Sequence, residues 1–238
     1  MKKSKLTLIS HYYNNIDSLL NQIILWNSFP HEIRECIEIV VIDDCSNNNI
    51  ELDLSKLNSN LNLNIFRILD DIPWNQAGSR NLGAFLSSSP WSLFFDIDQK
   101  LTPEGINNII SNIGLFDSSC MYHFLSEGIL DSNNNNNPMI YAPSTYLANT
   151  NAFKNFGMLD EDFSGNYGYE DIYLHSVWEK NGKSRLLIND CIYFVDHMSA
   201  TVNLDRDLSI NKNLIELKIL SGTPRPKNIL RFNWTRTY

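Results

Sequence analysis

The run of apolar residues at positions 37–42 constrains the fold more than any other feature of this sequence. It reads IEIVVI, is nearly continuous in β-branched residues, and ends abruptly at Asp43 and Asp44. Such a run is typical of a strand covered on both faces, as strands are in parallel sheets. The chain has 238 residues, of which 43% are hydrophobic. It can therefore bury the core that such a sheet needs, and wholesale disorder is excluded.

Further strand candidates alternate with helical segments in the first half of the chain. The strand candidates are residues 5–10, 63–69 and 91–95. An apolar stripe at helical spacing begins at Ile16, residues 75–86 also have a helical pattern, and Pro103 suits the first turn of a helix that ends near residue 113. This alternation predicts an α/β domain with a mainly parallel sheet flanked by helices.

The second half of the chain has shorter and more irregular elements. We predict a helix over residues 169–180, short strands at 186–188 and 191–195, and a last amphipathic helix over 206–220. We therefore expect one main domain over residues 1–205, built from a first half (1–115) and a smaller second half (116–205). Residues 206–238 would form a C-terminal helix and tail.

Charge and composition exclude several classes of protein. The sequence has 19 Lys and Arg against 27 Asp and Glu, a net charge of -8, so it is a poor candidate for binding nucleic acid. No C-x-x-C pair is present, which argues against a structural zinc site and a dense disulfide framework. The apolar stretch after the basic start is too short for a signal peptide or a spanning helix. We therefore expect a soluble, cytoplasmic protein.

The tail is basic and contains aromatic residues. It could make a peripheral contact with a membrane or a partner, although a packed or frayed terminus is the simpler interpretation. The residues concerned are Lys227, Arg231, Trp234 and Arg236.

Acidic residues follow two of the predicted strands. Asp43 and Asp44 follow the second strand, and Asp96 and Asp98 follow the fourth. Ligands bind beyond the carboxyl ends of strands in open α/β sheets, but capping of a turn explains Asp43 equally well. For Asp96 and Asp98 capping is the weaker explanation, because two carboxylates near an apolar core repel each other unless a cation lies between them. Such oxygen ligands suit Mn²⁺ or Mg²⁺, which complete their shells with substrate phosphates.

The sequence lacks the familiar glycine-rich phosphate loops. The turn after the first predicted strand reads SHYYN at positions 10–14, and G-x-G-x-x-G is absent there. The pattern G-x-x-x-x-G-K-[ST] is absent as well. We therefore favour a metal-bridged diphosphate as the explanation of the acidic pairs.

A third cluster, GNYGYED at positions 165–171, leads into the predicted helix at 169–180. Glu170 and Asp171 in a first helical turn are favoured by the helix dipole, which is a sufficient structural explanation for them. The two glycines, Tyr167 and Tyr169 are not needed for capping and suit a loop that contacts a sugar-like ligand. A carboxylate there could act as a general base. His197, after the last predicted strand, is about as well explained by a structural role as by metal ligation.

Taken together, these motifs resemble those of GT-A-fold glycosyltransferases of the family 2 type, over about residues 6–197. The resemblance is carried by residues 6–14, VVIDDCS at 40–46, AGSRNLG at 77–83 and FFDID at 94–98. The segments at 156–161 and 168–171 are similar to the G-x-x-D-E…G-x-G-E-D region shared with β-1,4-galactosyltransferases and chondroitin-type polymerases.

The resemblance implies a Rossmann-like nucleotide-sugar half, residues 1–115, and an acceptor half, residues 116–205. Asp171 would be the catalytic base and Glu170 would bind hydroxyl groups beside it. The other implied roles are nucleotide-sugar binding by His11, Asp44, Arg80 and Asp96, metal ligation by Asp98 and His197, and acceptor binding by Tyr167 and Tyr169.

The implied reaction is a Mn²⁺- or Mg²⁺-dependent transfer of a sugar from a nucleoside diphosphate sugar, with a UDP-sugar favoured, to a hydroxyl acceptor such as a glycan. Inversion at the anomeric carbon is expected because the resemblance is to inverting enzymes. One alternative is a non-catalytic module that binds carbohydrate or nucleotide-sugar. A sugar nucleotidyltransferase is less favoured, because it needs a glycine- and arginine-rich loop after the first strand.

Overall fold

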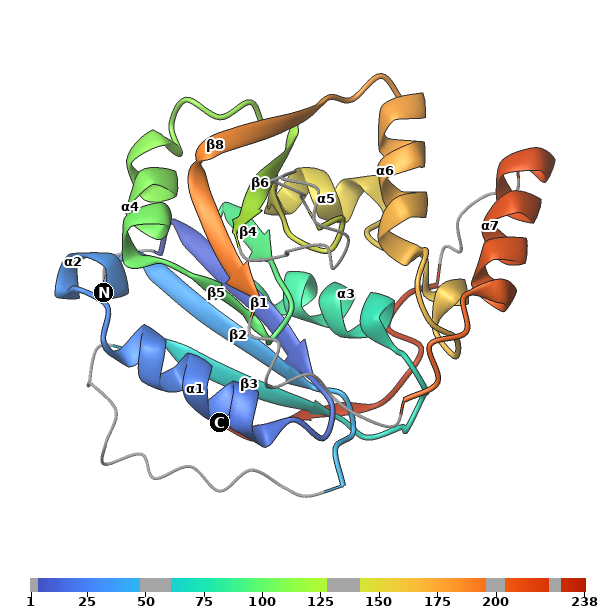
Figure 1. The fold of residues 1–238 in the computed structure, drawn as a ribbon, viewed down its shortest axis with the longest axis horizontal. Coiled ribbons are helices and arrows are strands. Elements are labelled where there is room, and N and C mark those ends of the chain that lie inside the picture. Colours follow the sequence, from blue (N-terminus) through green and yellow to red (C-terminus); the bar gives the residue numbers. More distant parts are fainter. Residues whose placement is uncertain (1–3, 48–60, 128–141, 196–203, 223–227) are drawn as a thin grey trace, which may run out of the picture.

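The computed structural model describes residues 4–47, 61–127, 142–195, 204–222 and 228–238. Its centre is a nine-stranded sheet in the order β5-β8-β6-β7-β4-β1-β2-β3-β9, with helices on both faces (Figure 1). This α/β architecture confirms the predicted fold class. Within the described residues, no helix combines the length and the hydropathy needed to span a bilayer.

The centre of the sheet is parallel. Its four strands, in spatial order, are β3 (Leu63–Ile68), β2 (Ile37–Asp43), β1 (Leu6–Tyr12) and β4 (Trp91–Phe94). Because these strands run the same way, their carboxyl ends meet at one edge, where a ligand site is expected.

The remaining strands extend this centre on both sides. Beyond β4 the sheet continues with β7 (Tyr146–Asn149), β6 (Met121–Glu127), β8 (Arg185–Val195) and β5 (Gln99–Leu101); beyond β3 it ends with β9 (Trp234–Arg236). β7 is antiparallel to both neighbours, whereas β6 and β8 pair in parallel. The second half of the chain therefore adds to the same sheet as the first.

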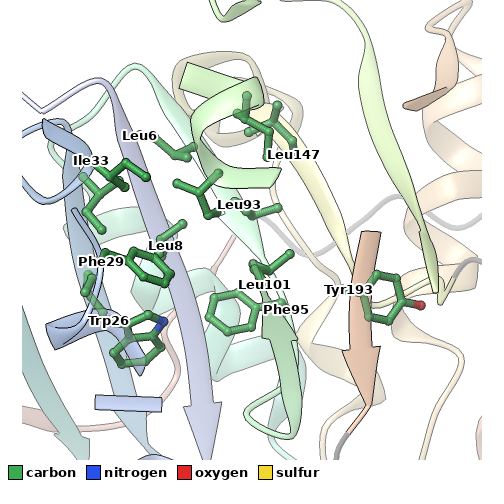
Figure 2. Close-up of a cluster of buried hydrophobic side chains, with 14 of the residues drawn as sticks. Leu6, Leu8, Trp26, Phe29, Ile33, Leu93, Phe95, Leu101, Leu147 and Tyr193 are labelled. Atoms are coloured by element: carbon green, nitrogen blue, oxygen red, sulfur yellow. The ribbon is translucent and has the colours of Figure 1, made fainter. Parts of the chain in front are cut away.

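Helices α1, α2 and α4 cover one face of the sheet, and α3, α5 and α6 cover the other. The helices are α1 (Ile16–Asn27), α2 (His31–Arg34), α3 (Gln76–Leu86), α4 (Pro103–Asn112), α5 (Thr150–Phe156), α6 (Glu170–Lys180) and α7 (Ser209–Ser221). A short 3-10 turn, η2 (Glu161–Phe163), precedes α6. Figure 2 shows part of the core between the sheet and α1, α2 and α4, to which Leu6 and Leu8 of β1 and Trp26 of α1 belong.

The run at residues 37–42 behaves as its composition predicts. Every residue of β2 is buried. Ile39 and Val41 belong to the core beneath α1, whereas Val40 and Ile42 belong to a cluster on the opposite face. The doubly covered strand predicted from sequence is confirmed.

The predicted apolar stripe of α1 is only partly buried. Leu19 and Ile23 contact the core, whereas Ile16, Leu20 and Ile24 are exposed, Ile24 at 68%. The sheet contacts a narrower arc of this helix than its sequence pattern covers, and the buried side is completed by Ser18, Gln22 and Trp26. Likewise, the two short strands predicted at 186–188 and 191–195 form one long strand, β8.

The C-terminal tail packs against the sheet edge and adds a strand to it. β9 pairs antiparallel with β3, and Trp234 contacts Phe66 edge-on at 5.8 Å between ring centroids. The Ile65 N–H donates to the Tyr238 carbonyl over 2.9 Å. Of the two interpretations of the tail, these contacts favour the packed terminus for its described residues.

Two buried histidines, His123 of β6 and His175 of α6, lie side by side. The rings of His123 and His175 meet edge-on at 4.8 Å between centroids, and Arg185 Nη1 lies 3.2 Å from His175 Nδ1. Burial, reinforced by the charge of Arg185, lowers the pKa of His123 to about 4. Burial and the neighbouring His123 lower the pKa of His175 to about 2. Both side chains are therefore neutral at pH 7.

These pKa values predict acid sensitivity. Below pH 6.5 the unfolded chain binds protons at these positions that the folded chain does not, so stability falls as the pH falls. His123→Phe keeps a ring and removes one titrating group. We expect the loss of unfolding free energy between pH 7 and pH 5 to be smaller in this variant by about 2 kcal/mol. Urea denaturation at the two pH values measures it.

The control is the exposed His31→Gln, which should lose as much stability between these pH values as the wild type. An equal loss in His123→Phe would show that His123 does not carry the acid sensitivity.

Candidate functional site

A cavity of about 570 Å³ opens at the carboxyl ends of β1, β2, β3 and β4. The strand ends and the loops after them contribute His11, Asp44, Asp71, Asp96 and Asp98 to its wall. The opposite side is formed by the loop before α6 and by the segment that leads into α7, including Tyr167, Arg206 and Ile210. The cavity therefore lies between the two halves of the chain.

The structure brings half of the predicted site residues together on the wall of this cavity. His11, Asp44, Asp96, Asp98 and Tyr167 line it. The remaining predicted residues in the described part of the chain, which are Arg80, Tyr169, Glu170 and Asp171, do not line the cavity wall. His197 falls in 196–203 and lies outside the described residues.

Asp43 and Asp44, adjacent in sequence, do different things. Asp43 Oδ1 accepts from the Ser46 N–H over 2.8 Å, and its Oδ2 accepts from Arg67 Nη1 over 2.6 Å. Asp43 is thus a capping residue, satisfied within the protein. Asp44 faces the cavity, and burial raises its pKa to about 7 against the opposing hydrogen bonds of Ser79 and Asn75. Asp44 is the one of the two that is available to a ligand.

His11 lies at the end of β1 beside the buried charges of the site. Burial, together with the positive charge of Arg80, lowers its pKa to about 4. The imidazole is therefore neutral at pH 7 and can accept or donate a hydrogen bond at the cavity wall without adding charge.

Arg80 lies beneath the cavity and connects carboxylates from both halves of the chain. It is 1% exposed. Its Nη1 donates to Asp171 Oδ1 and Oδ2, both at 2.8 Å, and its Nη2 donates to Asp96 Oδ1. Glu170 Oε1 lies 3.8 Å from Nη1. One guanidinium thus joins the end of β4 to the first turn of α6.

Three acidic side chains surround Arg80, and their combined negative charge, if all were ionised, would exceed its single positive charge. Burial, and then the charge of Asp171, raises the pKa of Glu170 to about 8, so Glu170 is mostly protonated at pH 7. Burial also raises the pKa of Asp171, while Arg80 acts in the opposite direction. Because Asp171 and Asp96 have the direct contacts with Arg80, we assign the negative charges to them and the proton to Glu170.

Asp98 is the carboxylate best placed for a metal ion. It is half-buried on the cavity wall, whereas the oxygens of Asp96 already accept from Arg80 and Ser144. Across the described ranges, no three His, Cys, Asp or Glu side chains form a group that could hold an ion. The donor set fits Mn²⁺ or Mg²⁺ that takes most of its ligands from phosphates and water, as these ions commonly do.

Trp74 and Arg206 complete the cavity wall. The sequence predicted for Trp74 only a place in the core or the pocket wall, and it predicted no site role for Arg206. Trp74 packs on Tyr167 at 4.5 Å between ring centroids, and its Nε1 donates to the Asp205 carbonyl over 2.5 Å. Trp74 has φ of 50°, a left-handed conformation that is costly for a bulky residue. Its position after the third strand was a usable signal, because that strand ends at the same sheet edge. Arg206 had no such signal, because only folding brings it to the wall.

Comparison with family models and solved structures identifies proteins that this chain is similar to. The model described as glycosyl transferase family 2 matches residues 13–177. The crystal structure of S. aureus TarS 1-349 in complex with UDP-GlcNAc superposes with a TM-score of 0.63 and 18% identity, covering 91% of this chain and 66% of that one. The crystal structure of S. aureus TarS 1-349 without a named ligand superposes with a TM-score of 0.62 and 19% identity, covering 80% of this chain and 60% of that one.

A more distant likeness is the crystal structure of GalNAc-T7 with UDP, GalNAc and Mn²⁺, with a TM-score of 0.55 and 13% identity, covering 82% of this chain and 44% of that one. The chain thus spans less than two thirds of the length of these structures. At such identities the likeness shows the fold. A comparison with curated proteins finds no match.

The Arg80 cluster yields a stability prediction. Arg80→Met removes the one positive charge that contacts both Asp96 and Asp171 among the described residues, so we expect it to cost about 3–5 kcal/mol of unfolding free energy at pH 7. Without Arg80 the folded-state pKa values of Glu170 and Asp171 rise further, so acidification to pH 5 should recover part of the loss. Denaturation at pH 7 and pH 5 measures both effects.

Arg236→Met, which removes an exposed arginine from β9, is the control and should cost much less. A loss in Arg80→Met that does not shrink on acidification would contradict the assignment of the charges.

Proposed function

Because the chain belongs to glycosyltransferase family 2, we propose that it transfers a sugar from a nucleoside diphosphate sugar to a hydroxyl acceptor. The observation that carries the proposal is the single cavity at the carboxyl ends of the parallel strands. His11 at the end of β1 and Asp44 after β2 line one part of it, and Asp96 and Asp98, which follow β4, line the neighbouring part. The strand order reverses at β1, which has β2 on one side and β4 on the other. In α/β folds a nucleotide with its diphosphate extends across such a reversal.

We place the nucleobase near Asp44 and the diphosphate near Asp98. An ionised Asp44 accepts a hydrogen bond from a ring N–H of the base, and its amide neighbour Asn75 fixes the carboxylate from behind. Uracil presents one such N–H. The structural likeness to proteins solved with UDP or UDP-GlcNAc supports a UDP-sugar as the donor.

Asp98 would hold a divalent ion, with His197 as a second ligand proposed from the family resemblance. When bound, Mn²⁺ or Mg²⁺ neutralises charge that builds up on the departing diphosphate. Arg206 adds a positive charge on the opposite wall. Asp96, held by Arg80 and by Ser144, positions the ribose or the donor sugar with the carboxylate already oriented.

Asp171 is the proposed base. Arg80 holds its carboxylate ionised, and Asp171 takes the acceptor proton as the hydroxyl attacks the anomeric carbon from the face opposite the diphosphate. Protonated Glu170 donates a hydrogen bond to a sugar hydroxyl beside it. Tyr167, packed on Trp74, offers an aromatic face to the acceptor, which we propose is a sugar, and Tyr169 supports the same loop. Attack from that face would invert the configuration at the anomeric carbon, as the resemblance to inverting enzymes implies.

One observation favours a binding module that lacks catalysis. Both Asp171 oxygens accept from Arg80, and Asp171 does not line the cavity wall. Transfer therefore requires the acceptor to reach the carboxylate beside Arg80. Isothermal titration with UDP- and GDP-sugars, with and without Mn²⁺, followed by a product assay, separates the two functions. Donor binding with no turnover on any acceptor would favour the module.

Asp98→Ala tests the metal. We expect it to abolish transfer and to remove the effect of Mn²⁺ on donor binding, because Asp96, the other carboxylate that follows β4, is engaged by Arg80. Asp71→Ala, another aspartate of the same wall, is the matched control and should keep Mn²⁺-dependent binding. Retained metal dependence in Asp98→Ala would place the ion elsewhere.

Asp171→Asn tests the base. We expect turnover to fall by about two to four orders of magnitude while donor affinity is kept, because the amide cannot take the proton. Arg80 keeps its contact with Asp96, so the cavity should retain its shape. Initial rates and titration of the donor measure the two quantities separately. Full turnover in Asp171→Asn would refute its role as base.

A further inference from the structure

We propose that Asn211 of α7 is a positioning residue, which holds the loop between η2 and α6 in the conformation that presents Tyr167 and the start of α6 to the site. The proposal rests on the proposed function for its catalytic consequence. Asn211 lies beyond residues 13–177, the part of the chain that the family model matches. Its role therefore comes from this structure alone.

A single amide group of Asn211 contacts three backbone carbonyls, one at the last residue of η2 and two in the loop itself. Nδ2 lies 3.0 Å from the Phe163 oxygen, 2.8 Å from that of Asn166 and 2.8 Å from that of Gly168. Asn211 is fully buried. Since carbonyl oxygens only accept, the NH₂ end of the amide must face them, which settles its orientation. No other side chain in the described hydrogen bonds contacts more than one carbonyl of this loop.

The loop needs such support because its backbone is strained. Gly165, Gly168 and Tyr169 all have positive φ, and Tyr169 at 71° is a bulky residue in the left-handed region. Conformations of this kind persist only where the surrounding structure determines them. A Cβ on Gly168 would lie 2.7 Å from Leu208 Cδ2, so α7 and the residue before it press closely on the loop.

The loop places the groups of the proposed reaction. Tyr167, in the middle of the loop, packs on Trp74. Glu170 and Asp171 follow the loop directly as the first residues of α6. On the other side, the Gly165 N–H donates to the Pro73 carbonyl over 2.7 Å, and Ser164 Oγ donates to Asn75 over 2.8 Å. Asn211 thus fastens the loop from the side that the segment 73–75 does not reach. A displacement of about 1 Å at the reacting groups can cost about a hundredfold in rate.

The experiment compares two substitutions that remove the amide donor. Asn211→Asp keeps the shape but places a carboxylate oxygen against three carbonyls, whereas Asn211→Ala removes the group. Two controls lie on the same helix. Asn213→Ala removes an exposed asparagine, and Lys218→Met removes the ion pairs to Asp160 and Asp162 without touching the loop carbonyls.

The first readout is hydrogen exchange of the backbone amides of residues 164–171, which does not depend on activity. We expect exchange there to rise by about tenfold or more in both Asn211 variants, and more in Asn211→Asp than in Asn211→Ala. In Lys218→Met, exchange should rise at α7 and η2 and stay near wild type in the loop. An equal rise in the loop for Lys218→Met and Asn211→Ala would reduce Asn211 to a general anchor of the helix and overturn the proposal.

The second readout is kinetic, with UDP titration in Mn²⁺ and initial rates of UDP release from the UDP-sugar that binds best. We expect kcat to fall by about tenfold or more in the Asn211 variants, while UDP affinity and donor KM change by less than about twofold. Unchanged kcat with a loosened loop would also overturn the proposal. If the wild type releases no UDP from any donor, the proposed function fails, and the exchange result still decides the role of Asn211.

Discussion

The contact of Arg80 with Asp96 and Asp171 is the interaction on which the site depends. Asp96 follows β4 in the first half of the chain, and Asp171 lies on α6 in the second, so one buried guanidinium fixes the distance between the two halves. A buried arginine without partners would be far too costly, and so would these carboxylates without the arginine. The cluster therefore forms only when both halves are in place, and the cavity above it forms with it.

The cluster also distributes roles among carboxyl groups that look equivalent in sequence. Arg80 and Ser144 occupy the oxygens of Asp96. Burial raises the pKa of Glu170, and Arg80 counteracts this rise only weakly because it lies farther from Glu170 than from Asp171. Glu170 therefore takes up the proton. Asp98 is left as the half-buried carboxylate on the wall. The carboxyl groups for which we propose different roles thus differ in whether and how closely they contact Arg80.

The elements that could be predicted from the sequence were those whose buried positions form a continuous or periodic pattern of apolar residues. The strand at residues 37–42 and the strand at 91–95 were identified because both of their faces are apolar. α3 was identified from its helical pattern and α4 from Pro103 at its first turn. The width of the buried face of α1 was not predictable, since it depends on the neighbours that α1 meets. The strand β9 was missed because three residues at a sheet edge carry no periodic signal.

The sequence by itself determined that acidic residues would gather at one edge of a parallel sheet, because strands of one direction end together and Asp44, Asp96 and Asp98 directly follow strands. It also determined the family, since the motifs lie in order along the chain. Only the tertiary structure decided that Asp43 caps a turn while Asp44 faces the cavity, that Arg80 lies beneath the site, and that Trp74, Arg206 and Asn211 complete it. These assignments depend on contacts between segments far apart in the chain, and no local pattern records which segments meet.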